Sequence, residues 1–297
     1  MVANRLSLAL GGGAAKGLAH VGVLQGLAED GVEVAGVAGT SMGAIVGALV
    51  AQGLTAAQIA ALFRAVDWVR LGRIMVASVS GTAFSDMVRE SFGGIRIEEL
   101  AVPYAAVCCD LDTGEMVSLT SGDLADAVTA SAAIPGILPL RSLDGRRLVD
   151  GAVVEPVPVT AATSLADAPV LAVNVVRPAA PDRFGGAIVT SLPMKVELPS
   201  VVGRIERWLR RQRDTGDPDG IQSRLSRWET VMRSFHIMQY RLATCGQREV
   251  ATVEPPVGRF GWFDFHRVDE IVDAGYRAYR AWAETADAAD GAPRESG

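Results

Sequence analysis

Near its N-terminus the chain passes twice from a short apolar run, through a glycine-rich turn, into an apolar pattern of helical period. The runs, turns and helical patterns occupy residues 5–10, 11–13 and 16–29, and then residues 32–37, 39–43 and 44–51. A strand that leads through a tight turn into a helix, and does so repeatedly, is typical of a parallel sheet with helices on both faces. The sequence therefore predicts an α/β fold.

The rest of the chain continues this alternation of strand-length and helical patterns. We expect a helix capped by Thr55, a strand pair at 104–109 and 116–119, a helix over 123–133, strands at 147–149 and 170–175, a helix over 221–238, a strand at 250–253 and a helix over 269–284. Residues 178–220 are rich in Pro, Gly and Arg and have weaker periodicity. We therefore expect a single domain over residues 1–297, with 178–248 as an insertion or cover segment.

Charge and cysteine content narrow the range of functions. The formal net charge is −6, which gives no general affinity for nucleic acid because phosphate binding needs a basic face. Cys108, Cys109 and Cys245 cannot form a disulfide framework, and no Cys/His cluster has zinc spacing. The N-terminal apolar run is too short for a secretory signal. We expect reduced thiols, a cytoplasmic protein and no metal.

Residues 34–53 contain no charged residue, and Gly43 and Gly47 have the spacing found where membrane helices pair. The stretch also contains several other glycine and hydroxyl residues, at positions where a membrane helix would prefer larger apolar side chains. A buried strand followed by a buried helix explains the stretch better.

Ser41 lies in the turn between the second predicted strand and its helix, within Gly-Thr-Ser-Met-Gly at 39–43. This sequence matches the G-x-S-x-G pattern of a nucleophile elbow. Gly39 and Gly43 are needed because a side chain at either position would clash with backbone where the chain turns sharply. The helix that starts here directs its positive end toward developing negative charge. Ser41 is therefore a candidate nucleophile, and a purely structural serine turn is the alternative.

Gly11, Gly12 and Gly13 end the first predicted strand. In acyl transfer such a loop can present successive N–H groups to the oxyanion of a tetrahedral intermediate. A phosphate-binding loop and a plain turn are the alternatives. However, no G-x-x-x-x-G-K-[ST] pattern is present, and Ala14 takes the central glycine position of G-x-G-x-x-G. These departures disfavour a nucleotide site.

A serine nucleophile needs a base, and the chain has only three histidines. His20 follows the glycine loop as a packed or capping residue, whereas His236 and His266 could each complete a Ser…Asp…His order. None of the three lies on a strand-end loop. Asp150 does lie there, directly before Gly151, and a partly desolvated carboxylate has a raised pKa and can accept the serine proton. An ordinary Asp-Gly turn is the structural alternative.

Three motifs in this order resemble those of the patatin-like phospholipase family. They are Gly-Gly-Gly-Ala-Ala-Lys-Gly at 11–17, Gly-Thr-Ser-Met-Gly at 39–43 and Asp-Gly-Ala at 150–152, and segments 17–24, 131–136 and 153–158 also match. The similarity is dense from about residue 6 to residue 175 and returns weakly at 264–276. It implies a three-layer α/β/α fold with a mostly parallel central sheet, and a Ser-Asp dyad without a catalytic histidine.

Carried over by position, the resemblance makes Ser41 the nucleophile and Asp150 the base. It implies an oxyanion hole built by the glycine loop, chiefly by Gly12 and Gly13. The candidate oxyanion residues are Gly11, Gly12, Gly13, Ala14 and Met42, and the supporting residues are Lys16, Gly39, Gly43 and Gly151. Lys16 stands where the family has Arg or Lys, as a structural or electrostatic support.

Ala14 departs from the family pattern, because many members have glycine at this position. If the residue requires a positive φ, alanine costs about 1 kcal/mol and can shift one oxyanion donor. With a negative φ the substitution is harmless, because the donor is a backbone group. We expect the harmless case.

The resemblance implies hydrolysis of an acyl ester, of the phospholipase A or lysophospholipase type, through an acyl-serine and without a cofactor. A histidine-dependent α/β-hydrolase and a non-catalytic lipid-binding relative remain as alternatives. The expected partner is a lipid or other acyl-ester substrate. Residues 203–213 hold five Arg and one Glu, which indicates either a basic amphipathic helix in peripheral contact with the inner membrane face or a solvated charged face.

Overall fold

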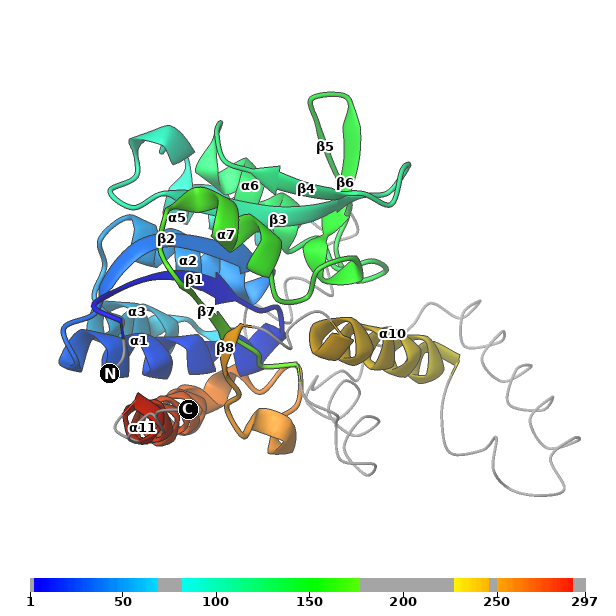
Figure 1. Cartoon of the computed structure of the whole chain (residues 1–297). Helices are drawn as coiled ribbons and strands as arrows, with labels where there is room; N and C mark the ends of the chain where they lie inside the picture. Colours follow the sequence, from blue (N-terminus) through cyan, green and yellow to red (C-terminus); the bar gives the residue numbers. More distant parts are fainter. Residues whose placement is uncertain (1–2, 69–81, 177–226, 246–249, 291–297) are drawn as a thin grey trace, which may run out of the picture.

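The computed structural model describes residues 3–68, 82–176, 227–245 and 250–290, and it confirms the predicted α/β architecture (Figure 1). Eight strands form one sheet in the order β5-β6-β3-β2-β1-β7-β8, with β4 beside β3. The strands are β1 (Arg5–Leu10), β2 (Glu33–Thr40), β3 (Tyr104–Asp110), β4 (Met116–Leu119), β5 (Arg141–Leu143), β6 (Arg146–Asp150), β7 (Val170–Val173) and β8 (Ala251–Val253). Strands β3, β2, β1, β7 and β8 are parallel, whereas the β3–β4, β3–β6 and β5–β6 pairs are antiparallel.

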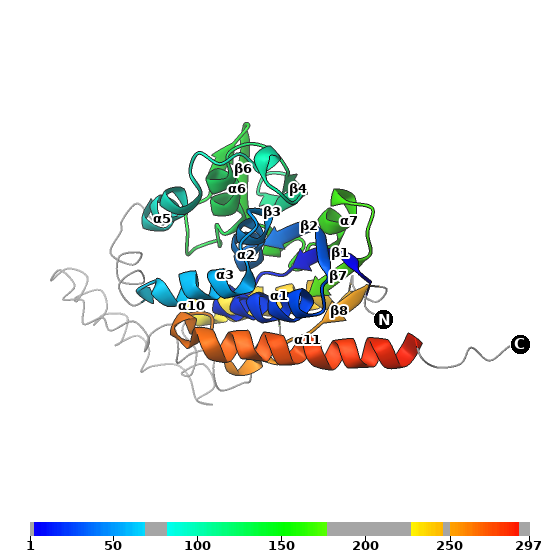
Figure 2. The ribbon, with the colours of Figure 1, turned by 90° about the vertical axis from the view of Figure 1, so that its left-hand side faces the viewer.

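Helices cover both faces of this sheet and complete the three layers (Figure 2). They are α1 (Ala19–Glu29), α2 (Met42–Ala51), α3 (Ala56–Ala65), α5 (Thr82–Phe92), α6 (Leu124–Ser131), α7 (Val159–Leu165), α10 (Arg227–Cys245) and α11 (Val268–Asp290). The larger core joins Leu8, Leu10 and Val37 of the sheet to α1, α2, α3, α6 and α11. The opposite face presents small residues such as Ala9 and Ala38, against which α7 packs. Alternation of large and small side chains along the strands therefore separates the two cores.

Most predicted elements agree with the structure, and their ends have local causes. Thr55 caps α3 through a capping box with Gln58. Gly31, with φ of 70°, ends α1 as expected. Helix α1 begins at Ala19 rather than Lys16, because residues Ala14–Leu18 form a 3₁₀ turn. Three elements, α5, α7 and β5, were not expected from the sequence.

The uncharged stretch 34–53 is confirmed as a buried strand and a buried helix, β2 and α2. Across the described ranges, no helix combines the length and the apolar character needed to cross a bilayer.

The single-domain organisation with a cover segment stays a prediction. All eight strands belong to one sheet. Of residues 178–248, only α10 lies within the described ranges. The basic segment 203–213 lies outside the described residues.

Candidate active site

Ser41 stands alone between β2 and α2, where the chain reverses direction. Its φ of 57° and ψ of −119° place it in a backbone region that L-residues rarely adopt. A Cβ atom on Gly39 would meet the backbone of Gly43, and a Cβ on Gly43 would meet the carbonyl oxygen of Leu10. The two glycines are thus required by close backbone packing. They leave Ser41 at the N-terminal end of α2, where the helix dipole favours negative charge.

Strand β3 lies between β2 and β6, and its pairing with both strands aligns Asp150 with the turn that contains Ser41. Thr40 at the end of β2 pairs with Val107 of β3, and the next residue, Cys108, pairs with Asp150. Strand β6 runs antiparallel to β3 and ends at this point. Gly151 then lies against the carbonyl of Val107, with no room for a side chain. The register of two strand pairs therefore brings the carboxyl group to the elbow.

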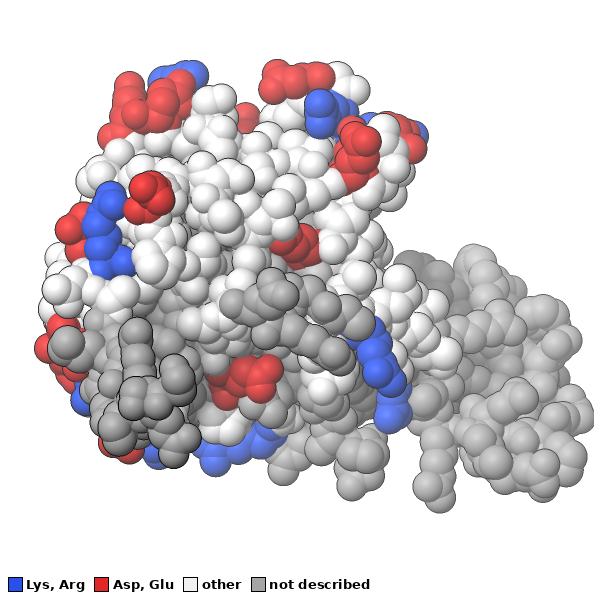
Figure 3. Space-filling view, viewed as in Figure 1, with Lys and Arg blue, Asp and Glu red and all other residues white. Residues whose placement is uncertain are grey.

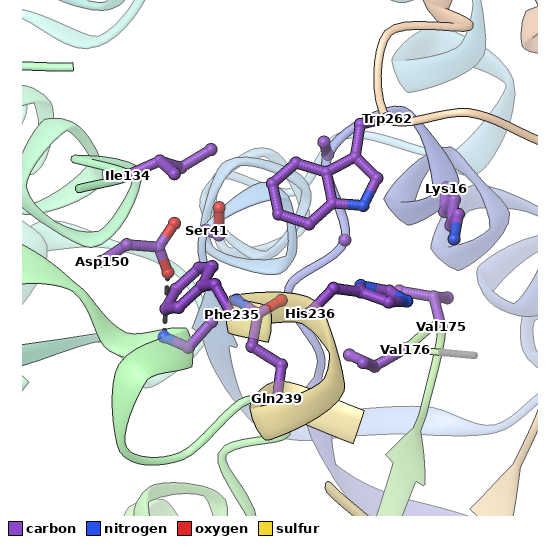
Figure 4. A pocket seen from close by; sticks show the side chains of 13 residues that line it. Lys16, Ser41, Ile134, Asp150, Val175, Val176, Phe235, His236, Gln239 and Trp262 are labelled. Atoms are coloured by element: carbon purple, nitrogen blue, oxygen red, sulfur yellow. Dashed lines mark hydrogen bonds between the residues drawn. The ribbon is translucent and has the colours of Figure 1, made fainter. Parts of the chain in front are cut away.

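The carboxyl group of Asp150 is buried beside Ser41, with only 2% of the residue exposed. Burial raises the pKa of Asp150 to about 6, while hydrogen bonding from the Ser41 side chain and from the Ala152 N–H acts in the opposite direction. The Ala152 nitrogen lies 2.9 Å from Oδ1 (Figure 4). A carboxyl group that ionises near pH 6 is able to accept a proton at neutral pH.

Ser131 holds the backbone of the elbow in place. Its Oγ accepts a hydrogen bond from the Ser41 N–H at 3.0 Å and donates one to the Val107 carbonyl at 2.6 Å. Ser131 is fully buried at the end of α6. The contact ties Ser41 to the strand that also pairs with Asp150. Residue 131 lies in one of the motifs that resemble the family, but no role for its hydroxyl was expected.

The glycine loop after β1 offers fewer free N–H groups than expected. The Gly11 N–H donates to the Val173 carbonyl at 3.1 Å, and the Gly12 N–H donates to the Pro156 carbonyl at 2.8 Å. The expectation that Gly12 is a chief oxyanion donor therefore needs correction, because this N–H is already hydrogen-bonded. Gly12 contributes shape instead: a Cβ there would lie 3.3 Å from the Ser41 Cβ.

Three N–H groups near Ser41 remain open. Those of Gly13, Ala14 and Met42 have no hydrogen-bond partner among the described residues. Gly13 and Ala14 line the same pocket as Ser41, and Met42 is the next residue along the chain. The loop and the start of α2 thus offer backbone donors from two directions.

Ala14 has a positive φ of 48°, so the expectation of a harmless negative φ is wrong. The residue lies in the region that favours glycine, where the Cβ of alanine crowds the following carbonyl. The loop keeps this conformation because its neighbours are fixed: the Ala15 N–H donates to the Trp262 carbonyl at 3.1 Å, and the Lys16 N–H donates to the Gly13 carbonyl at 3.1 Å.

We expect Ala14→Gly to raise the free energy of unfolding by about 0.5–1 kcal/mol, because glycine adopts this φ without strain. Chemical denaturation of the two proteins measures the difference. Ala15→Gly is the matched control, since Ala15 is buried in the adjoining 3₁₀ turn and should lose stability. A lower stability for Ala14→Gly would contradict the strained assignment.

Lys16 and His20 support the glycine loop from within the core. Lys16 is 2% exposed; burial lowers its pKa to about 8, and Asp264 partly opposes this effect. The His20 Nε2 lies 2.7 Å from the Gly11 carbonyl oxygen. A carbonyl only accepts, so Nε2 carries the proton. Burial lowers the pKa of His20 to about 4, with the Gly11 carbonyl acting in the opposite direction. The neutral ring therefore anchors the loop, as the packed role expected for His20 requires.

Residues far apart in the sequence close the pocket around Ser41 (Figure 4). The lining residues are Gly13, Ala14, Lys16, Ser41, Ile134, Asp150, Ala152, Val175, Val176, Phe235, His236, Gln239 and Trp262. The cavity volume is about 20 Å³, close to the space that one water molecule needs. The wall formed by Trp262 was not expected, because no local pattern in the sequence links it to Ser41, whereas α10 belongs to the segment 178–248 that we expected as an insertion or cover.

The other two histidines occupy different surroundings. His236 lines the Ser41 pocket and packs edge-on against Trp262, with ring centroids 5.8 Å apart. Figure 4 shows its ring directed away from Ser41. His266 instead lines a second surface pocket, which does not include Ser41. In the described part of the chain, no group of three His, Cys, Asp or Glu residues is arranged to hold a metal ion.

Comparison with known proteins relates this chain to a family. The model for patatin-like phospholipase matches residues 8–163, a range that includes Ser41 and Asp150. One NTE family protein of Mycobacterium tuberculosis is 31% identical over 287 residues, which cover 93% of this chain and 46% of that protein. Another from the same organism is 39% identical over 160 residues, which cover 52% of this chain and 44% of that protein.

More distant proteins share the same region or the same fold. Patatin-like phospholipase domain-containing protein 7 of Rattus norvegicus is 29% identical over 306 residues, which cover 93% of this chain and 20% of that protein. The crystal structure of VipD from Legionella pneumophila superposes with a TM-score of 0.50 at 12% identity, over 95% of this chain and 67% of that one. This likeness supports the fold alone.

The chain spans less than half the length of the mycobacterial relatives that it matches. The family model nevertheless matches more than half of the 297 residues, and the elbow, the glycine loop and Asp150 all lie inside the matched range. The chain therefore belongs to the patatin-like phospholipase family.

Proposed function

We propose that the protein hydrolyses acyl esters of lipids, with Ser41 as nucleophile and Asp150 as its catalytic base. The observation that carries the proposal is the buried carboxyl group of Asp150 beside the Ser41 side chain, with a pKa raised by burial to about 6. A strained serine at the start of a helix supplies the attacking oxygen.

In the proposed first step, Ser41 Oγ attacks the ester carbonyl carbon while Asp150 accepts the hydroxyl proton. The carbonyl oxygen becomes an oxyanion, and the N–H groups of Gly13, Ala14 and Met42 are our candidates to stabilise it. The bond to the alcohol oxygen then breaks, and Asp150 returns the proton to the leaving alcohol. An acyl-serine remains.

In the second step, Asp150 accepts a proton from water as the water oxygen attacks the acyl-serine carbonyl carbon. The tetrahedral intermediate collapses, the bond to Ser41 Oγ breaks, and the proton returns from Asp150 to Ser41. The products are a carboxylic acid and the regenerated serine. In each step Asp150 starts as a carboxylate, takes up a proton during the attack, and gives the proton back as the tetrahedral intermediate breaks down. One carboxyl group therefore serves both steps.

The pocket lining supports a lipid acyl chain as the group beside Ser41. Ile134, Val175, Val176, Phe235 and Trp262 surround the site with apolar surface, which favours a hydrocarbon chain over a polar substrate. Membership of the patatin-like phospholipase family agrees with a lipid substrate.

A panel of esters tests this function directly. Release of free fatty acid from a glycerophospholipid, a lysophospholipid and a diglyceride is measured with the native chain and with Ser41→Ala. We expect release from at least one substrate and its loss in Ser41→Ala. Release that survives in Ser41→Ala, or no release from any ester by a folded native chain, would overturn the proposal.

The activity should depend on pH through Asp150. Since the carboxylate is the reactive form, kcat/KM for a soluble ester should rise as pH increases through about 6 and level off above it. The midpoint of a carboxyl group changes little with temperature, whereas that of an imidazole falls on warming. A profile measured at two temperatures therefore separates the two. A midpoint that falls on warming would indicate a histidine instead.

Histidine-dependent catalysis keeps one candidate, because His236 lines the same pocket as Ser41. Loss of hydrolysis in His236→Ala, together with retention in Asp150→Asn, would select this mechanism. The direction of the His236 ring in Figure 4 favours Asp150.

A further inference from the structure

Helix α10 turns one buried face toward the Ser41 pocket. Met232, His236, Gln239 and Ala243 are buried, and their spacing of three and four residues places them in one stripe. His236 and Gln239 line the pocket. The positions on the opposite side of the helix, such as Ser234 and Arg241, are exposed.

A second apolar stripe runs along α10 about 100° around the helix from the buried one, because each of its members directly precedes a buried residue. Val231, Met238 and Leu242 are 58%, 56% and 42% exposed, and they lie seven and four residues apart, which again aligns them along the helix. Ile237 is also exposed. Of the seven large apolar side chains exposed in the described ranges, four lie on α10. Scattered exposed residues need no explanation, but a concentration of this kind marks an interaction surface. We call Val231, Met238 and Leu242 the outer stripe.

The charge around the outer stripe is opposite in sign to that of the whole protein. The chain has a net charge of −6, yet Arg241 directly precedes Leu242 and lies three residues after Met238, which places it beside the outer stripe, whereas Arg233 lies on the other side of the helix. Figure 3 shows basic side chains among uncharged ones where α10 reaches the surface. An apolar stripe beside an exposed arginine suits a surface that combines apolar chains with negative headgroups.

The position of the outer stripe matters because α10 is also a wall of the Ser41 pocket. The pocket's cavity of about 20 Å³ is close to the space that one water molecule needs. Ile134 forms part of another wall, and the chain continues from Ile134 to the exposed Leu140. Exposed apolar groups therefore lie on elements at both sides of the site.

We propose that the outer stripe docks α10 on a lipid bilayer that contains anionic phospholipid. Docking would hold the pocket at the source of its lipid esters, whereas a protein partner on the outer stripe would cover the same helix without supplying substrate. The choice of a lipid surface rests on the proposed function. Docking itself needs no catalysis and is measured independently.

Vesicle flotation of the full chain tests the docking surface. The Ser41→Ala chain prevents lipid hydrolysis, and the vesicles are phosphatidylcholine alone or phosphatidylcholine mixed with phosphatidylglycerol. The combined variant Val231→Ser/Met238→Ser/Leu242→Ser should bind the mixed vesicles more weakly. We expect its partition coefficient to be lower by at least about tenfold. Leu62→Ser is the matched control, because Leu62 is 48% exposed on α3, away from α10 in Figure 1. The control should bind like the parent.

Charge is tested by Arg241→Gln, which should reduce binding to the mixed vesicles about fivefold and leave binding to phosphatidylcholine unchanged. Three outcomes would overturn the proposal: no binding by the parent chain, equal binding by the combined variant, or equal loss in Leu62→Ser. Retained binding with a lower melting temperature in the combined variant would instead show that the outer stripe is covered by protein. Absence of ester hydrolysis by the folded native chain, together with intact vesicle binding, would reject the proposed function and leave docking in place.

Discussion

Asp150→Asn is expected to lower kcat for ester hydrolysis by about 10³–10⁴-fold while the chain remains folded. Asparagine has nearly the same shape and can still accept the hydrogen bond from the Ala152 N–H, which now lies 2.9 Å from Oδ1. It cannot accept a proton from Ser41. The loss should therefore appear in kcat, with the residual rate supplied by backbone donors and by substrate binding.

The same substitution should stabilise the fold at neutral pH. Folding raises the pKa of Asp150 from 3.8 to about 6, so the folded chain binds this proton more tightly than the unfolded chain does. Stability is therefore greatest below about pH 4 for this group and is lost as pH rises through about 6. The difference corresponds to about 3 kcal/mol at most. Asparagine never ionises, so Asp150→Asn should unfold with a free energy higher than native by about 1–3 kcal/mol at pH 8.

A second buried carboxylate provides the control. Asp110 is 6% exposed at the end of β3 and accepts a hydrogen bond from the Asp112 N–H at 3.0 Å, outside the Ser41 pocket. Asp110→Asn should leave kcat within about twofold of native. Near-native kcat in Asp150→Asn, or equal losses in the two variants, would remove Asp150 from the proposed mechanism.

Gly43→Ala is expected to have the largest effect on stability. The added Cβ would meet the carbonyl oxygen of Leu10 at the end of β1, and backbone of a central strand cannot move aside without disturbing the sheet. Overpacking against backbone should lower the free energy of unfolding by about 3 kcal/mol or more, or prevent folding. Equilibrium denaturation, or the yield of soluble protein, measures the effect.

Gly47→Ala on the same helix is the matched control. Its added Cβ would lie 3.1 Å from Val37 Cγ2 and 3.4 Å from Tyr104 Cε2, which are side-chain atoms able to shift. Alanine also gains up to about 1 kcal/mol in helix propensity. We expect Gly47→Ala to stay within about 1 kcal/mol of native. Equal stability in both variants would mean that the elbow is not held by the contact between Gly43 and β1.

Much of the fold could be predicted because its elements have strong local patterns. β1 begins and ends where the sequence indicates, and α2 extends the expected helix only by its first two residues. β2 runs on to Thr40 because that residue pairs with Val107, a contact that depends on tertiary structure. Helix α7 was not expected, since it is short and rich in Thr and Ser; Ala161 and Ala162 form it by packing on the sheet.

The candidate site, like the fold, could be predicted only in part. Glycine turns at two strand ends made Ser41 and Asp150 candidates, and the resemblance to the family assigned their roles, which stay predictions. Motif spacing was insufficient for the donors: the Gly12 N–H is used by the distant Pro156 carbonyl. The Ser131 hydroxyl also escaped notice, because it meets a residue 90 positions away. Contacts between distant segments carry no local signal in one sequence.

The proposed pairing of Ser41 with Asp150 is tested most directly by covalent labelling with a fluorophosphonate probe. The native chain, Ser41→Ala and Asp150→Asn are compared, and the labelled peptide is identified by mass spectrometry. The account predicts a label on Ser41 in the native chain, none in Ser41→Ala, and labelling at least about 10²-fold slower in Asp150→Asn. Labelling of a different residue, or of Ser41 at an unchanged rate in Asp150→Asn, would contradict it.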